Sequence, residues 1–212
     1  MSENATGLIL RTRPLTETSL IVHWLTPNFG RLATVAKGAR RPKSPFRGKL
    51  DLFYQADFSF ARSQRSELHN LREVALRDTR AALRKDLGYV EQASYAAALI
   101  EQSTELDSPL PGIFDIMRGF LDALPRQPPQ PQAIFALEMK LLAELGLEPD
   151  LSEARLTAGS SEVLKSLRTS DWPVVTVIKP SQAQMTELRQ FLHGFLIYHL
   201  GKLPANRASL FR

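Results

Sequence analysis

Apolar and polar positions alternate along the first part of the chain. The alternation is clearest over Leu50–Phe60, where every second residue from Leu50 onward is apolar or aromatic. Similar short segments, rich in β-branched and aromatic residues or strictly alternating, are Gly7–Arg13, Thr18–Thr26, Arg31–Lys37 and Glu67–Leu76. A period of two is typical of a strand with one buried face. Five short strands in under 80 residues predict a small closed barrel, because closure removes exposed strand edges.

From about residue 78 the apolar residues recur at spacings of three and four, which indicates helices. We expect helices over residues 83–106 with a break near Gly88, and over 109–124, 133–145 and 181–201. The last of these has the best-marked ends, because Ser181 and Gln184 match a capping box and Gly201 suits a helix end. Residues 151–179 look irregular, and Trp172–Ile178 has the composition of a short strand.

These patterns predict an α+β chain in which the strands come first. Residues 1–78 are expected to form a five-stranded antiparallel barrel of the oligonucleotide-binding (OB) type, and residues 79–212 an all-helical domain. Within that domain the proline-rich residues 125–131 predict an extended inter-helix connection. The chain has no cysteine, which excludes disulfides and thiolate zinc sites, so we expect no metal and no zinc site in the helical domain.

Positive charge is concentrated in the barrel half. Residues 1–80 hold 14 Lys and Arg against 7 Asp and Glu, whereas the remainder holds 13 against 15. Residues 30–49 carry seven cations and no acid. Glycines and prolines in the second half of this segment predict an extended loop. A cationic loop without neighbouring acids suits contact with a polyanion, with a solvated surface loop as the alternative interpretation.

The predicted nucleic-acid interface combines this segment with the basic face of the first strand. Candidate phosphate-binding residues are Arg11, Arg13, Arg31, Lys37, Arg40, Arg41, Lys43, Arg47 and Lys49. Aromatic residues lie among these cations, and rings that stack on bases often accompany Lys and Arg that hold the backbone. The candidate stacking rings are Phe29, Phe46 and Phe53, for which core packing is the competing interpretation.

Catalytic chemistry is poorly supported. The four histidines show no ligand spacing, a phosphate-cradling Gly-x-x-x-x-Gly-Lys-Ser/Thr loop is absent, and acids are too scattered in the barrel half for a two-metal nuclease. We therefore expect no enzyme and no cofactor. No apolar stretch approaches 18 residues and no signal peptide is evident, so a soluble cytoplasmic protein is expected. The alternatives are an RNA-binding module of translation or ribosome assembly, a nuclease, and an adaptor for an acidic protein tail.

The same residues resemble the N-terminal signature of the bacterial recombination-mediator RecO family. The resemblance is carried by residues 10–20, Phe29-Gly30-Arg31-Leu32, Val35-Ala36-Lys37-Gly38-Ala39-Arg40-Arg41 and residues 44–53. It returns in residues 141–147 and in a closing motif of His199-Leu200-Gly201, Pro204, Arg207 and Leu210-Phe211. Unlike many members of the family, this chain lacks four zinc-binding cysteines, and it ends shortly after the closing motif.

The resemblance implies a DNA repair and recombination role in the RecF pathway, in association with the bacterial nucleoid. It implies binding of single- and double-stranded DNA, annealing of complementary strands, and help in loading RecA onto DNA coated with single-stranded DNA-binding protein (SSB). Implied partners are RecR, the acidic C-terminal tail of SSB and, indirectly, RecA. The SSB tail is expected to bind the helical domain at a site of apolar residues and a cation: Ile134, Phe135, Leu137, Lys140 and Leu141.

Overall fold

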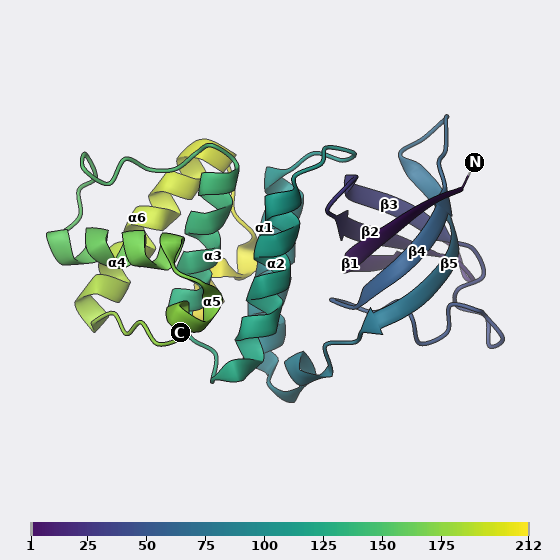
Figure 1. The fold of residues 1–212 in the computed structure, drawn as a ribbon, viewed down its shortest axis with the longest axis horizontal. Helices are drawn as coiled ribbons and strands as arrows, with labels where there is room; N and C mark the ends of the chain where they lie inside the picture. Colours follow the sequence, from purple (N-terminus) through teal and green to yellow (C-terminus); the bar gives the residue numbers. More distant parts are fainter. Residues whose placement is uncertain (1, 212) are drawn as a thin grey trace. The chain divides into compact units, whose positions relative to one another are not determined.

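Five strands close into a barrel at the start of the chain. The structure is a computed structural model that describes residues 2–211. The strands are β1 (Ser2–Pro14), β2 (Leu20–Thr26), β3 (Gly30–Ala36), β4 (Gln55–Ala61) and β5 (Leu68–Asp78). They pair in the order β1-β2-β3-β5-β4 and back to β1, and helices follow (Figure 1). The predicted fold class, an OB-type barrel followed by helices, is confirmed.

One strand pairing corrects the prediction of a purely antiparallel barrel. β3 and β5 run parallel, with Ala33 opposite Leu68, whereas the other four pairings are antiparallel. Directions cannot alternate all the way around a closed ring of five strands, so at least one neighbouring pair must be parallel. β1 makes closure possible because it is long: its first half pairs with β4 and its second half with β2.

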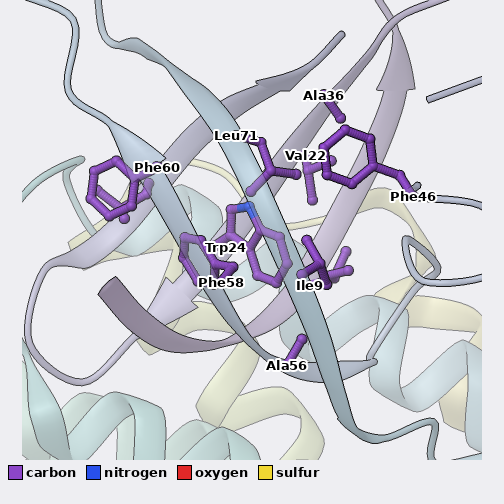
Figure 2. Packing of buried hydrophobic residues seen from close by; sticks show 11 residues of the cluster. Ile9, Val22, Trp24, Ala36, Phe46, Ala56, Phe58, Phe60 and Leu71 are labelled. Carbon is purple, nitrogen blue, oxygen red and sulfur yellow. The ribbon is translucent and has the colours of Figure 1, made fainter. Parts of the chain in front are cut away.

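Aromatic residues fill the barrel interior. The Trp24 ring stacks on Phe58, with ring centroids 4.0 Å apart and planes 16° from parallel, and Figure 2 shows the two rings within the buried cluster. The indole N–H of Trp24 donates a hydrogen bond to the Thr34 hydroxyl at 2.8 Å, which satisfies the buried polar atom. Inward residues alternate along β4, where Ala56, Phe58 and Phe60 are buried, as the period of two predicts.

The strand predicted over Leu50–Phe60 begins later, at Gln55. Before it the chain bends at Phe53, which has a positive φ of 65°. The Phe53 N–H donates to the Ile9 carbonyl at 2.8 Å, and the Ile9 N–H donates to the Tyr54 carbonyl at 2.9 Å. Phe53 is therefore a buried bend residue and does not lie on the polar face of a strand.

A segment from the helical half of the sequence packs with the barrel. The chain divides into two compact units, and Thr104–Asp115 belongs to the same unit as the strands. The Asp107 N–H donates to the Arg31 carbonyl at 2.9 Å. A Cβ on Gly30 would lie 2.0 Å from the Ser108 carbonyl oxygen, so glycine is required where this segment meets the start of β3.

Helices and short 3-10 turns, joined by loops, follow the barrel strands. The helices are α1 (Leu87–Ser103), α2 (Pro111–Ala123), α3 (Pro131–Glu144), α4 (Ala158–Thr169), α5 (Trp172–Val175) and α6 (Gln182–Leu200), with 3-10 turns η1 (Ala81–Lys85), η2 (Leu124–Arg126) and η3 (Ala205–Phe211). The capping box at the start of α6 is confirmed, since both reciprocal hydrogen bonds of Ser181 and Gln184 are present. None of the helices in residues 2–211 is both long and apolar enough to cross a membrane.

Two expectations between α3 and α6 were wrong. Residues 158–169 form helix α4, started by the Thr157 side chain, which accepts a hydrogen bond from the Ser160 N–H. Trp172–Ile178 is not a strand: its first four residues form α5, with Pro173 in the first turn, where the missing N–H costs nothing. The apolar composition of this segment instead supplies buried Val175 to the helical core.

Helix α3 is the centre of the second unit. Every residue from Ile134 to Met139 is buried, and α3 packs against α1, α4, α5 and α6. A helix buried on all sides needs apolar residues around its whole circumference, and α3 departs from this at two buried polar positions, Gln132 and Glu138. That carboxylate is neutralised by Arg207 from η3.

Candidate nucleic-acid interface

The basic loop, residues 37–50 between β3 and β4, is a series of tight turns. Backbone N–H groups donate three residues back, from Arg41 to Gly38 at 3.0 Å, from Ser44 to Arg41 at 3.1 Å and from Arg47 to Ser44 at 3.2 Å. Gly38 has a φ of 70°, which favours glycine in the first turn. The extended loop predicted from the glycines and prolines is therefore corrected: these residues make consecutive turns, which hold the loop backbone in a defined shape.

The loop is also fixed to the barrel at two points. Phe46 is only 7% exposed and points into the barrel core with Val22 and Ala36, as Figure 2 shows. On the other side the Arg40 N–H donates to the Thr18 carbonyl at 3.0 Å, so the loop packs along the turn between β1 and β2. Because the loop is held at both of these points, its cations project from a structured support.

Six cations project from this loop. Lys37, Arg40, Arg41, Lys43 and Arg47 are exposed and Lys49 is partly exposed. Within residues 2–211 none of the six forms an ion pair with a carboxylate. Their side-chain contacts go to backbone carbonyls: the Arg40 guanidinium donates to Thr16 at 3.3 Å and that of Arg47 to Pro42 at 3.4 Å. The loop therefore presents uncompensated positive charge.

Arg31 has a different environment from the loop cations. Its Nε donates to the Thr104 hydroxyl at 2.7 Å and its Nη2 to the Thr104 carbonyl. This partly buried side chain thus holds the Thr104–Asp115 segment against the barrel. Arg11 and Arg13 are exposed on β1, as the alternation predicts.

The positive potential of these arginines reaches His23 on β2, which is paired with Arg11 in the register. Burial lowers the pKa of His23 to about 4, and the charges of Arg11, Arg13 and Arg31 act in the same direction. His23 is therefore neutral at physiological pH and does not add to the cationic surface.

The three candidate stacking rings are not equally accessible. Phe46 and Phe53 are 7% and 3% exposed, so neither presents a ring face to a base, and the interpretation as core packing applies to both. Phe29 is partly exposed, packs edge-to-face on Phe60 and has the Arg62 guanidinium 5.7 Å from its ring centroid. It lies at the turn between β2 and β3, apart in sequence from the basic loop.

The predicted apolar site on α3 lies inside the helical core. Ile134, Phe135, Leu137 and Leu141 are at most 1% exposed, so they offer no surface to a peptide. Lys140 is half-buried, and its ammonium donates to the Arg168 and Ser170 carbonyls at 2.7 Å each. Burial lowers the pKa of Lys140. This lysine caps the end of α4 and is not available as a cation for a ligand.

A hollow that the sequence did not reveal lies where α6 begins. Its volume is about 420 Å³, and it is lined by Lys179, Met185, Arg189 and Phe211 among other residues, none of them acidic. Apolar side chains and two cations meet here because η3 returns to α6 and Phe211 stacks on Phe135. The only sequence signal was the closing Leu210-Phe211 pair.

Comparisons with known proteins match both halves of the chain to one family. Residues 1–80 match the N-terminal model of recombination protein O, and residues 84–154 match its C-terminal model. Similar proteins include the DNA repair protein RecO of Anaeromyxobacter sp. (strain K), 34% identical over 69% of this chain, and that of Bacillus subtilis (strain 168), 30% identical over 69%. The DNA repair protein RecO of Rhodopirellula baltica is 29% identical over 80% of this chain.

The matched regions cover 58%, 56% and 62% of those three relatives, so the chain spans about three fifths of their length. The two family models match consecutive parts of the chain, the first across the barrel and the second across the first helices. The similar proteins all carry the same name. The chain belongs to the RecO family of recombination proteins.

Proposed function

We propose that this protein acts in DNA repair and recombination as a mediator that binds single- and double-stranded DNA and anneals complementary strands. It also helps to load RecA onto DNA coated with SSB. The observation that carries the proposal is the basic loop, whose six cations have no carboxylate partner in residues 2–211. Family membership supports the same role.

The physical mechanism requires no covalent step. Two complementary strands repel each other through their phosphates, and cations that neutralise phosphates on both strands lower this repulsion. Lys37, Arg40, Arg41, Lys43, Arg47 and Lys49 would supply these cations, with Arg11 and Arg13 extending the surface along β1. A support held by turns and by Phe46 keeps the charges in place, so less conformational entropy is lost on binding.

We also propose three protein partners. RecR, and indirectly RecA, are proposed on the basis of family membership alone. The acidic tail of SSB has a structural candidate site, the hollow lined by Lys179, Met185, Arg189 and Phe211, which we name the α6 hollow. Cations beside partly exposed apolar side chains suit a peptide that carries both acids and apolar residues. This site replaces the buried residues of α3.

The salt dependence of DNA binding tests the central proposal. If about five phosphates are contacted, the logarithm of affinity should fall with the logarithm of salt concentration at a slope of about −4 to −5 for duplex DNA. Replacing Lys37, Arg40, Arg41 and Lys43 together by alanine should flatten this slope by roughly 3 to 4. Fluorescence anisotropy at several salt concentrations measures the slope. In annealing assays with SSB-coated strands, the same variant should lose most of its acceleration.

A charge-matched control separates the loop from net charge. Replacing Arg65, Lys85, Lys165 and Lys202 by alanine removes the same total charge from exposed positions outside the loop. The control should keep a slope close to that of the unmodified protein. Equal slopes for the loop variant and the unmodified protein would contradict the loop assignment, and a strong preference for RNA of the same sequence would favour a role in translation.

A further inference from the structure

The basic loop encloses an open hollow of about 430 Å³. Three arginines of the loop, Arg40, Arg41 and Arg47, line it. The remaining lining is apolar or small and includes Leu20, Phe46 and Leu50, with no acidic residue. Cationic and apolar groups thus meet within one small space, at the point where the loop covers the barrel core.

This combination suits one particular part of a nucleic acid. A hollow of this volume lies within the usual range of small-ligand sites, so it can admit a single nucleotide unit but not a duplex. The planar guanidinium groups can stack on a base or bind phosphate oxygens, and the apolar lining removes the base from water. A paired and stacked base of a duplex cannot enter without leaving its partner.

The hollow is held open by the loop's own hydrogen bonds. The turn bonds from Arg41 to Gly38 and from Arg47 to Ser44 flank it, and the Lys49 N–H donates to the Phe46 carbonyl at 3.0 Å. Phe46 cannot close the hollow, because its ring is committed to the barrel core. A site shaped before binding loses less conformational entropy when it is filled.

We infer that this hollow, the loop hollow, receives one unpaired base of a bound DNA strand while the surrounding arginines hold that strand's phosphates. The inference rests on the proposed DNA binding and adds a base-dependent contact to it. A second hollow on the barrel, about 620 Å³ and partly lined by Lys49 and Arg72, is less suitable because Asp57 and Glu73 also line it. Carboxylates there repel a nucleic-acid backbone.

The inference is tested by separating bases from phosphates in the ligand. Two single strands of about 15 nucleotides are compared, one of thymidines and one of abasic residues with the same number of phosphates. The thymidine strand should bind roughly 5- to 150-fold more tightly, since a stacked base contributes about 1–3 kcal/mol. Both strands should show similar salt slopes.

Variants that fill the loop hollow without changing its charge test whether the preference for the thymidine strand arises there. Leu50→Trp and Ala39→Phe place bulk at two lining positions, and circular dichroism melts confirm that each variant folds. Either variant should reduce the preference for thymidine to less than about 3-fold while leaving the salt slope unchanged. Gln64→Trp, at an exposed position outside the loop, should keep the full preference.

The outcomes distinguish this inference from the proposed function. Equal binding of both strands with a steep salt slope overturns the loop hollow as a base site and leaves DNA binding by the loop in place. A thymidine preference that survives in both filling variants also overturns it, because the base is then held elsewhere. Absence of binding to either strand at low salt overturns the proposed function itself.

Discussion

At the residue scale, one buried ion pair explains why the closing motif contains an arginine. Arg207 in η3 donates from Nε to Glu138 Oε1 at 2.7 Å and from Nη2 to Oε2 at 2.9 Å. The Tyr95 hydroxyl of α1 donates to the same carboxylate at 2.5 Å. Glu138 is fully buried and Arg207 nearly so. This network joins α1, α3 and η3, and it satisfies a charge that would otherwise destabilise the core.

Replacing Arg207 by methionine should lower the free energy of unfolding by about 3–5 kcal/mol, because it leaves the Glu138 carboxylate buried without a counter-ion. Urea denaturation followed by circular dichroism measures the change. The double variant E138Q/R207M removes both charges and keeps an acceptor for the Tyr95 hydroxyl. It should regain more than half of the loss.

The partly exposed pair of Arg168 and Glu148 provides the comparison. Arg168→Ala should cost less than about 1 kcal/mol, since surface ion pairs contribute little. If E138Q/R207M proves as unstable as the single Arg207 variant, lost packing and not an unpaired charge accounts for the effect.

His23 makes the stability of the barrel sensitive to acid. Its native pKa is about 4, below the ordinary value of 6.5 for histidine. Between these two values the unfolded chain binds a proton that the folded chain does not, so the free energy of unfolding decreases as the pH falls from about 6.5 toward 4. Urea denaturation at about pH 7.5 and pH 5 should show this loss, and His23→Gln should reduce it.

His193 is an appropriate control because it is exposed on α6. His193→Gln should leave unchanged the loss of unfolding free energy between about pH 7.5 and pH 5. If His23→Gln loses as much stability on acidification as the unmodified protein, groups other than His23 cause the acid sensitivity.

At the scale of elements, the connection between β3 and β4 is where composition was least informative. Its glycines and prolines correctly excluded a helix, yet the residues form consecutive turns, with Phe46 buried beneath them. A loop anchored by a buried aromatic residue keeps its cations at a fixed spacing, which an unanchored extended loop does not. The segment that the sequence predicted to be an extended loop is therefore a structured part of the barrel unit.

The start of helix α6 is where we expect a protein partner to bind. An acidic peptide with apolar residues at its C-terminus should bind the α6 hollow. Replacing Lys179 and Arg189 by alanine should weaken binding by about 10-fold or more, since a hydrogen bond to a charged group contributes roughly 1.5–3 kcal/mol. Isothermal titration calorimetry with a synthetic peptide measures the affinity. The matched control K165A/K202A removes the same charge from exposed positions elsewhere in the helical unit. Equal weakening by both variants would show that the peptide responds only to net charge.

At the scale of the whole molecule, charge and packing are divided between two units. The positive excess lies in the first 80 residues, whereas the rest of the chain is slightly acidic. Long-range attraction of a polyanion should therefore be directed to the barrel, and the helical unit offers a smaller cationic site at α6. In the proposed mediator role, the barrel would hold the nucleic acid and the helical unit would hold the protein tail.

Residue spacing and composition were enough to predict five strands ahead of the helices, the ends of α6 and the position of the cationic segment. These properties depend on residue spacing over a few positions, which hydrophobic period and local composition report directly. The OB-type barrel followed by helices was predictable for this reason, as was the concentration of charge in residues 30–49.

Which of these residues face solvent, and which contact one another, could be seen only in the folded chain. Arg31 binds Thr104, Lys140 caps α4, and Phe46 and Phe53 enter the core. The local sequence around these residues does not distinguish them from residues that are exposed. The loop hollow and the α6 hollow are likewise lined by residues distant in sequence, such as Leu20 and Arg47 in the first and Met185 and Phe211 in the second. Local patterns contain no information on such contacts, because chain closure and core packing create them.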